Sequence, residues 1–368
     1  MKILIIEPFF SGSHKVWADE YVKFSKHNVE IISLPGRFWK WRMHGGAVSL
    51  AKKYHENGYK PDLILATDML NLPVFQSLVK PNCPVCIYFH ENQITYPWSN
   101  RDKDLELQRD KHYGFINYSS ALSSDHIYFN SQFHLNSFFA GLEEFLKQFP
   151  DYREIHYIDS IREKSSVLHL GMDLKKFDLY QSDRQKYHSP IILWNHRWEH
   201  DKNPKIFFNA LEKLSNQGMD FQLAVLGKEF KNENSYFTKA RKNLKKHIVQ
   251  FGFTPTFEEY AKWLWKADIL PVTSIQDFFG ISIMEAVYCE TIPILPRRLS
   301  YQKLFQEKEN PQLFYENNSD LLEKLKTSIH NISSLQQKKY QAIAADYDWS
   351  NMITEYDSEF EKYMTKIK

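Results

Sequence analysis

Two carboxylates flank the start of a predicted helix in the segment from Asp277 to Glu285, which reads Asp-Phe-Phe-Gly-Ile-Ser-Ile-Met-Glu. If the helix begins near Phe279 or Gly280, Asp277 precedes it and Glu285 lies about a turn and a half inside it. Unpaired N–H groups at a helix start attract a diphosphate, and carboxylates accept hydrogen bonds from hydroxyl groups. The segment is therefore a candidate binding site for a sugar nucleotide, although an ordinary helix capped by Asp277 has the same pattern.

A second group of charged residues follows the predicted strand Ile191–Trp194, in a loop that contains Arg197 and Lys202. Ligands of open parallel sheets bind at the carboxyl ends of the strands, so this loop lies where a ligand is expected. A guanidinium fork and a compact ammonium can stabilise the charge that grows on a departing diphosphate. Surface ion pairs with Glu199 and Asp201 are the alternative.

Polar residues also follow two predicted strands in the first half of the chain. Gly12 and Ser13 lie in a turn of small residues that leads into a helix at Val16. Gly12 allows close backbone approach and the helix N-terminus can receive a phosphate, although a simple tight turn capped by Ser13 fits equally well. His90, Glu91 and Asn92 follow the fourth strand, so His90 could bond a sugar hydroxyl and Glu91 could orient it. The alternative is a histidine that only caps the loop.

Cations and aromatic residues alternate in Arg37-Phe-Trp-Lys-Trp-Arg-Met-His44, which the strand pattern places in a loop. Such a mixture can neutralise phosphates and stack on unpaired bases, as in proteins that bind single-stranded RNA. A hydrophobic lid with solvated charges is the alternative. The lysine-rich stretch 228–246 adds a basic face or forms an amphipathic surface helix.

Composition indicates a globular protein of two domains. The chain has 368 residues, of which 43% are hydrophobic. A chain of this length is too long for one ordinary core. A net charge of +2 excludes a strongly basic protein that coats nucleic acid. No apolar run is long enough to span a bilayer, and the apolar start ends at Glu7, too early for a signal peptide. With only three cysteines, we expect a cytoplasmic protein.

Short apolar runs alternate with helical patterns, which is typical of parallel α/β sheets. We expect an α/β fold of two doubly wound, Rossmann-like domains, 1–182 and 190–346, with strand ends facing a cleft. The polar stretch Asp178–Pro190 is the expected linker, and the amphipathic segment 347–368 is a helix that crosses back to the first domain. The expected strands are Lys2–Ile6, Val29–Leu34, Leu63–Ala66, Val85–Phe89, Ile127–Phe129, Ser166–Leu170, Ile191–Trp194, Gln222–Leu226, Ile248–Phe251, Ile269–Val272 and Thr291–Leu295.

These motifs resemble those of a GT-B glycosyltransferase of the retaining group 4 type. The signature of that group pairs an Arg and a Lys after the first strand of the second domain with a Glu-x7-Glu motif, here Arg197, Lys202 and Asp277 to Glu285. A narrower resemblance, to the tRNA-queuosine mannosyltransferase family, rests on four longer strings: Pro8-Phe-Phe-Ser-Gly-Ser-His14, Pro35-Gly-Arg-Phe-Trp-Lys-Trp-Arg42, Phe89-His-Glu-Asn-Gln93 and Trp194-Asn-His-Arg-Trp-Glu-His-Asp-Lys202.

The resemblance implies a hexosyltransferase with GDP-mannose as donor and queuosine at the wobble position of tRNA-Asp as acceptor. It assigns the nucleotide ribose to Glu285, the diphosphate to Arg197 and Lys202, and a contact near the reacting carbon to His90. It assigns the mannose to Asp277 with the amides of Phe279, Gly280 and Ile281, and further diphosphate contacts to Gly12 and Ser13. The residues expected to bind the acceptor tRNA are His14, Arg37, Trp39, Lys40, Trp41, Arg42, His44, Glu91 and Asn92.

The expected mechanism is same-face transfer, in which the departing phosphate oxygen takes the acceptor proton. We expect no cofactor and no metal, because the Asp-x-Asp patterns at 102–104 and 346–348 do not follow buried strands. We also expect no membrane association and no obligate protein partner. One departure from the group pattern is Asp277, which is one methylene shorter than Glu and bears on the choice of sugar. The alternatives are transfer of another sugar to a lipid, polysaccharide or small molecule, and a catalytically idle module that binds nucleotide or RNA.

Overall fold

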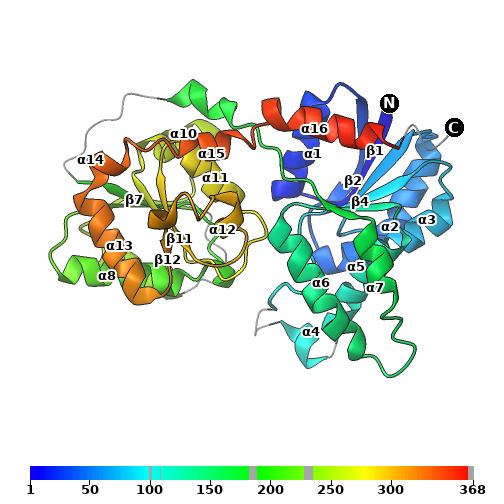
Figure 1. The fold of residues 1–368 in the computed structure, drawn as a ribbon, viewed down its shortest axis with the longest axis horizontal. Coiled ribbons are helices and arrows are strands. Elements are labelled where there is room, and N and C mark those ends of the chain that lie inside the picture. Colours follow the sequence, from blue (N-terminus) through cyan, green and yellow to red (C-terminus); the bar gives the residue numbers. More distant parts are fainter. Residues whose placement is uncertain (99–101, 108, 182–188, 228–234, 364–368) are drawn as a thin grey trace. The chain divides into compact units, whose positions relative to one another are not determined.

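The computed structural model describes residues 1–98, 102–107, 109–181, 189–227 and 235–363 (Figure 1). The chain separates into two compact units. Unit 1 comprises residues 1–173 and the segment that begins at Trp349, and unit 2 comprises Leu174–Asp348. The structure corrects the expected boundary, because the 3-10 helix η1 (Lys175–Tyr180) belongs to unit 2. Phe177 of η1 packs on Phe257, and the backbone carbonyl of Phe177 accepts a hydrogen bond from Trp265 Nε1 at 2.9 Å.

Unit 1 is built on a parallel six-stranded sheet with the strand order β2-β1-β3-β4-β5-β6. Every residue of β3 and β4 is buried, as expected for strands in the middle of a parallel sheet. The strands are β1 Lys2–Phe10, β2 Asn28–Pro35, β3 Leu63–Thr67, β4 Val85–Phe89, β5 His126–Phe129 and β6 Ser165–Val167. The helices are α1 Gly12–Phe24, α2 Trp39–Asn57, α3 Leu72–Val79, α4 Lys103–Glu106, α5 Asp110–Ser123, α6 Gln132–Lys147 and α7 Tyr157–Glu163.

Unit 2 repeats this plan with the strand order β12-β11-β10-β7-β8-β9. Its strands are β7 Ile191–Trp194, β8 Gln222–Leu226, β9 Ile248–Gly252, β10 Ile269–Pro271, β11 Ile292–Pro296 and β12 Phe314–Tyr315. The helical elements are η2 His200–Lys202, α8 Pro204–Asn216, α9 Ser235–Asn243, α10 Phe257–Lys266, α11 Ile281–Tyr288, α12 Tyr301–Leu304, η3 Pro311–Leu313, α13 Asn318–His330, α14 Ile332–Leu335 and α15 Gln341–Ala345.

The final helix, α16 (Trp349–Glu361), packs on unit 1 as the sequence predicts. Its buried Tyr356 accepts a hydrogen bond from Trp17 Nε1 of α1 at 3.2 Å and donates one to the carbonyl of His169 at 2.7 Å. The Asp357 carboxylate accepts a hydrogen bond from Ser25 Oγ at 2.6 Å. Helix α16 and the first strand and helix of the chain therefore belong to the same folded unit.

The predicted strands are confirmed, and most of their bounds agree to within one residue. The larger differences are that β1 continues to Phe10 rather than ending at Ile6, that β6 spans Ser165–Val167 rather than Ser166–Leu170, and that the two-residue β12 was not predicted. A larger correction concerns the segment expected to be an RNA-binding loop, because α2 begins at Trp39 and takes in most of it. Within the parts of the chain that the structure describes, no helix combines the length and apolarity that crossing a bilayer requires.

Candidate functional site

Lys202 is a buried cation at the end of the loop that follows β7. Its Nζ donates a hydrogen bond to the carbonyl of Gln276 at 2.9 Å and lies 3.1 Å from Asp201 Oδ2 and 3.5 Å from Asp277 Oδ2. Burial by itself would lower the pKa of Lys202, but Asp277 and Asp201 more than offset it and raise the pKa above 10.5. The ammonium is therefore charged at neutral pH, and it lies next to the candidate motif at the start of α11.

Asp277 precedes α11 as the sequence predicts, and unit 2 fixes its carboxylate from two sides. Tyr301 donates a hydrogen bond to Asp277 Oδ2 at 3.1 Å, and the Lys202 ammonium lies near the same oxygen. Gly280 caps the helix with a φ of 100°, a left-handed conformation that side chains rarely adopt. The helix proper begins at Ile281, so its first N–H groups have no acceptor within the helix.

Glu285 lies one turn inside α11 and is half-buried. Its Oε2 accepts a hydrogen bond from Tyr260 at 2.7 Å. Asn195, directly after β7, donates to the carbonyl of Ser282 at 2.7 Å and to Tyr260 at 3.3 Å. These bonds hold the start of α11 against the end of β7. The motif residues Lys202, Asp277 and Glu285 are thus brought together within unit 2.

His196 is another buried polar group of the same loop. Its Nδ1 lies 2.9 Å from Ser282 Oγ. Burial, and then the charge of Lys202, lower the pKa of His196 to about 3, so the ring is neutral. Arg197 differs from these neighbours, because its side chain is exposed and Nη2 lies 3.2 Å from Glu199 Oε2. The two predicted cations therefore have unlike surroundings.

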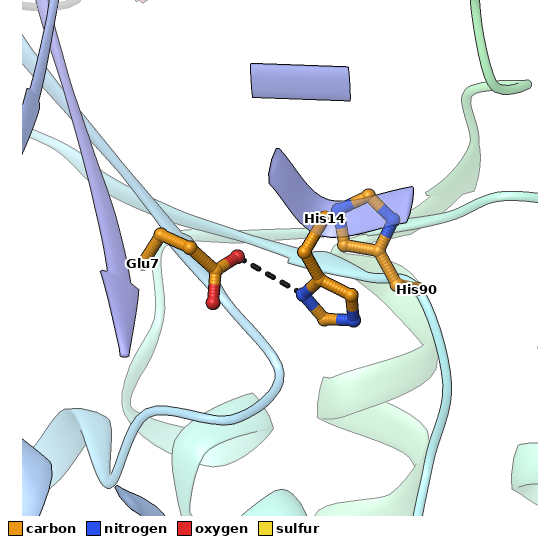
Figure 2. A group of neighbouring side chains, drawn as sticks. All are labelled: Glu7, His14 and His90. Atoms are coloured by element: carbon orange, nitrogen blue, oxygen red, sulfur yellow. Dashed lines mark hydrogen bonds and ion pairs between the residues drawn. The ribbon is translucent and has the colours of Figure 1, made fainter. Parts of the chain in front are cut away.

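In unit 1, Glu7, His14 and His90 form a buried cluster, drawn in Figure 2. They come from β1, the first turn of α1 and the residue after β4. Nδ1 of His14 donates a hydrogen bond to Glu7 Oε2 at 3.0 Å, and the ring centroids of His14 and His90 are 4.2 Å apart. One ligand atom from each side chain lies within 4.8 Å of the others, which is also a separation that could hold a metal ion.

Charge divides unequally between the two histidines. Burial opposes protonation of His14, but the carboxylate of Glu7 outweighs it and raises the pKa of His14 to about 9. Burial, and next the charge of His14, lower the pKa of His90 well below its usual value. Burial also raises the pKa of Asp68, which follows β3 and accepts a hydrogen bond from the His90 backbone N–H at 2.8 Å. At neutral pH, His14 is an imidazolium and His90 a neutral ring.

The two residues after His90 differ in exposure. Asn92 is fully buried, and its Oδ1 accepts hydrogen bonds from the backbone N–H groups of Ile94 and Thr95 at 3.1 and 2.9 Å. Asn92 therefore shapes the loop. Glu91 is half-buried and accepts a hydrogen bond from Gln93 Nε2 at 3.0 Å. Of this pair, Glu91 is better placed to meet a ligand.

The predicted RNA-binding segment divides into a packed face and an exposed face. Trp39 packs on Trp98 and Tyr113, with ring centroids 6.1 and 5.1 Å away. The Lys40 ammonium lies 2.5 Å from Asp102 and 2.6 Å from Asp104. Burial works against the charge of Lys40, but these two carboxylates raise its pKa. Trp39 and Lys40 thus have structural partners within unit 1.

The exposed aromatic side chains of this segment are those of Phe38 and Trp41, which are 72% and 63% exposed. Phe38 has a φ of 57°, a left-handed conformation that turns the chain into α2. Arg37 lies over the ring of Phe38, 5.9 Å from its centroid, and Arg42 Nε donates to the carbonyl of Pro35 at 3.2 Å.

The remaining predicted residues of unit 1 lie at the surface. His44 of α2 is exposed as a residue, but partial burial of its ring, and next the nearby His112, lower its pKa. Gly12 and Ser13 are exposed in the first turn of α1, with Gly12 at a φ of 52°. The described part of the lysine-rich stretch forms α9 and the turn that follows it, whereas 228–234 lie outside the described residues.

Sequence reasoning missed Glu7, Asp68, Tyr260 and Tyr301. Glu7 follows the predicted strand Lys2–Ile6, and Asp68 follows β3. His90 was identified because polar residues at the carboxyl end of a strand face the ligand, and the same rule would have found these two residues. Tyr260 and Tyr301 give no such signal, because an aromatic residue in a helix is usually part of the core. Their importance lies in the hydroxyl, which reaches a carboxylate that is distant in sequence.

Residues 2–172 match the family described as tRNA-queuosine alpha-mannosyltransferase N-terminal, and residues 178–345 match the family described as glycosyl transferases group 1. A Drosophila melanogaster protein named tRNA-queuosine alpha-mannosyltransferase is 33% identical over 338 residues. The match covers 88% of this chain and 85% of that protein.

Several solved structures share the fold. A glycosyltransferase from Rickettsia africae aligns with a TM-score of 0.68 at 16% identity, over 99% of this chain and 98% of that one. Sucrose-phosphate synthase from Thermosynechococcus elongatus aligns over the whole of both chains with a TM-score of 0.73 at 13% identity. Anabaena HepE in complex with UDP aligns with a TM-score of 0.66 at 16% identity, over 98% of this chain and 100% of that one.

These likenesses and the two parallel six-stranded sheets confirm the predicted GT-B fold. The chain is a glycosyltransferase and belongs to the tRNA-queuosine alpha-mannosyltransferase family.

Proposed function

We propose that this protein transfers mannose from GDP-mannose to queuosine at the wobble position of tRNA-Asp, with retention of configuration. The observation that carries the donor half is the buried ammonium of Lys202, held by Asp201 and Asp277 beside the start of α11. A desolvated cation next to helix N–H groups suits a diphosphate whose charge grows as the glycosyl bond breaks. The acceptor half is supported by the family and by its Drosophila member.

In unit 2, each motif residue has one proposed task. Lys202 and the more exposed Arg197 bind the diphosphate, and Glu285 accepts hydrogen bonds from the nucleotide ribose. Asp277 and the amides at the start of α11, from Phe279 to Ile281, bind the hydroxyls of the sugar. The Tyr301 and Tyr260 hydroxyls, which donate to Asp277 and Glu285, hold each carboxylate in place.

The proposed chemistry needs no resident metal and no cofactor. The leaving phosphate oxygen takes the proton of the acceptor hydroxyl, while Lys202 and Arg197 stabilise the charge that remains on the diphosphate. Asp102 and Asp104, which resemble a metal motif in sequence, bind the Lys40 ammonium instead. Asp348 likewise accepts a hydrogen bond from the backbone N–H of Leu174 at 2.9 Å.

In unit 1, we propose that Phe38 and Trp41, with Arg37 beside them, stack on unpaired bases of the anticodon loop. Their exposure supports this role, because large aromatic side chains at a surface suit single-stranded RNA. Trp39 is less suited to it, since its ring packs on Trp98 and Tyr113. As a tRNA-modifying enzyme, the protein is proposed to act in the cytoplasm.

The proposal is tested with labelled nucleotide sugars and two tRNA pools, one with queuosine and one without, followed by nucleoside mass spectrometry. We expect mannosyl-queuosine from GDP-mannose only, with the same yield in EDTA. The Phe38→Ala/Trp41→Ala variant should bind tRNA about thirtyfold more weakly or worse, because each of the two stacked bases contributes roughly 1–3 kcal/mol. An exposed residue of the same helix, Val48, provides the control Val48→Ala. Equal reaction of both tRNA pools would overturn the acceptor assignment.

A further inference from the structure

The Glu7, His14 and His90 cluster has ring nitrogens that are suited to a ligand. Glu7 Oε2 accepts the hydrogen bond from Nδ1 of His14, so Nε2 of that ring is directed away from Glu7. Nε2 of His90 is buried and has no hydrogen-bond partner among the residues that the structure describes. Buried polar atoms nearly always have a partner, so this nitrogen indicates a bound group from outside the chain.

The position of His90 does not depend on a ligand. Its backbone N–H donates to Asp68 Oδ1 at 2.8 Å, and its carbonyl accepts a hydrogen bond from Asn130 Nδ2 at 2.8 Å. Its ring lies 4.2 Å from that of His14 and edge-on to Trp17 at 4.8 Å, measured between centroids. Backbone and ring are thus both held in place, which is what a pre-organised binding group requires.

The charges around the cluster restrict the kind of ligand. The titratable groups that face His14 and His90 come from β1, the loops after β3 and β4, and α6: Glu7, Asp68, Glu91 and His134. Carboxylates outnumber the single imidazolium, so a phosphate would meet net repulsion here. A metal ion would have to displace the proton that Glu7 stabilises on His14. Neutral hydroxyl groups meet neither obstacle.

We propose that His14 and His90 bind the two neighbouring hydroxyls on the cyclopentene ring of queuosine, with Glu7 as the positioning residue for His14. This inference rests on the proposed function. A charged His14 can only donate through Nε2, whereas a neutral His90 can donate or accept, and each hydroxyl does both. Glu7 does not touch the acceptor. It determines the tautomer, orientation and charge of His14.

The test is Glu7→Gln, which keeps the size of the side chain and removes its charge. With queuosine-containing tRNA as the varied substrate, wild-type kcat/KM should fall as the pH rises through about 9, where His14 loses its proton. In Glu7→Gln we expect this fall at least one pH unit lower, and a tenfold higher KM for tRNA at pH 8. Glu30→Gln, at an exposed position of the neighbouring β2, is the matched control.

A second variant, His14→Asn, keeps the proposal testable if Glu7→Gln does not fold. It should raise the KM for tRNA by a similar factor and remove the alkaline fall, while GDP binding stays unchanged. A wild-type pH profile in a folded Glu7→Gln or His14→Asn would overturn the proposal. So would one equivalent of zinc or manganese bound by the wild type and lost in His90→Gln. Failure of the wild type to modify queuosine-containing tRNA at all would instead overturn the proposed function.

Discussion

Each unit has a buried cation near the end of its sheet, Lys202 in unit 2 and His14 in unit 1, and the two have different surroundings. In unit 2, the Lys202 ammonium lies near two carboxylates and donates to a backbone carbonyl. In unit 1, the His14 ring donates to one carboxylate, that of Glu7. The pKa of Lys202 is raised above an already high value, whereas that of His14 is raised only to about 9. Similar folds therefore carry a permanent charge in one unit and a titratable charge in the other.

This difference matches the two kinds of ligand that we propose. A diphosphate needs a positive charge that persists throughout the reaction, and an ammonium with three donors can follow an oxygen as it moves away. Hydroxyl groups need directed hydrogen bonds more than charge, and a fixed imidazole ring provides direction. The neutral His90 and His196 beside these cations follow from the same physics, since burial and a nearby positive charge both lower the pKa of histidine.

The largest effect is expected for Lys202→Ala. Removing a buried donor that stabilises developing charge should lower kcat by about 10²–10³-fold. Steady-state rates with varied GDP-mannose would measure this loss, and GDP titration would show whether ground-state binding weakens too. Lys205→Ala, an exposed lysine at the start of α8, should behave as wild type. If Lys202→Ala kept more than a tenth of wild-type turnover, the proposed role of unit 2's buried charge would fail.

The titratable charge of unit 1 should appear as a pH dependence of stability. The pKa of His14 is about 9 in the folded chain against 6.5 unfolded, so protonation favours the folded state. This stabilisation is complete below pH 6.5 and lost as the pH rises through 9, by roughly 3–4 kcal/mol at most. Urea unfolding between pH 6.5 and 9.5 would measure it, with His14→Gln as the comparison. A wild type and a His14→Gln variant with parallel profiles would show that Glu7 and His14 form no such pair.

Much of the fold and of the candidate site in unit 2 could be predicted from sequence, because strands of a parallel sheet are continuous apolar runs and ligands bind where these strands end. That reasoning correctly placed Lys202, Asp277 and Glu285 on one unit. It placed Trp39 in a loop because the segment follows the second predicted strand. The helical spacing of Trp39, Met43 and Leu50 shows why that was wrong, since these residues share the buried face of α2.

Other features depend on contacts that no local pattern encodes. The exposure of Trp41, two residues from the packed Trp39, follows from the point at which α2 begins and from the left-handed Phe38 that precedes it. The pairing of Glu7 with His14 joins a strand to the next helix, and the charge of that pair depends on its burial. Sequence can identify such residues as candidates, but their protonation states arise only from the folded environment.

The smallest effect is expected for Asp277→Glu, which restores the residue typical of the group 4 signature. Asp277 Oδ2 lies 3.1 Å from the Tyr301 hydroxyl and 3.5 Å from the Lys202 ammonium, so an added methylene must shift the carboxylate away from at least one of them. A misplaced hydrogen bond to a sugar hydroxyl should lower kcat/KM by about tenfold, roughly 1.4 kcal/mol. Competition between GDP-mannose and GDP-glucose would measure whether the preference for mannose over glucose becomes smaller as well. Because the Lys202 charge itself stays in place, Asp277→Glu should change the choice of sugar far more than it changes GDP binding. An equal loss in GDP affinity would mean that Asp277 serves mainly to hold Lys202.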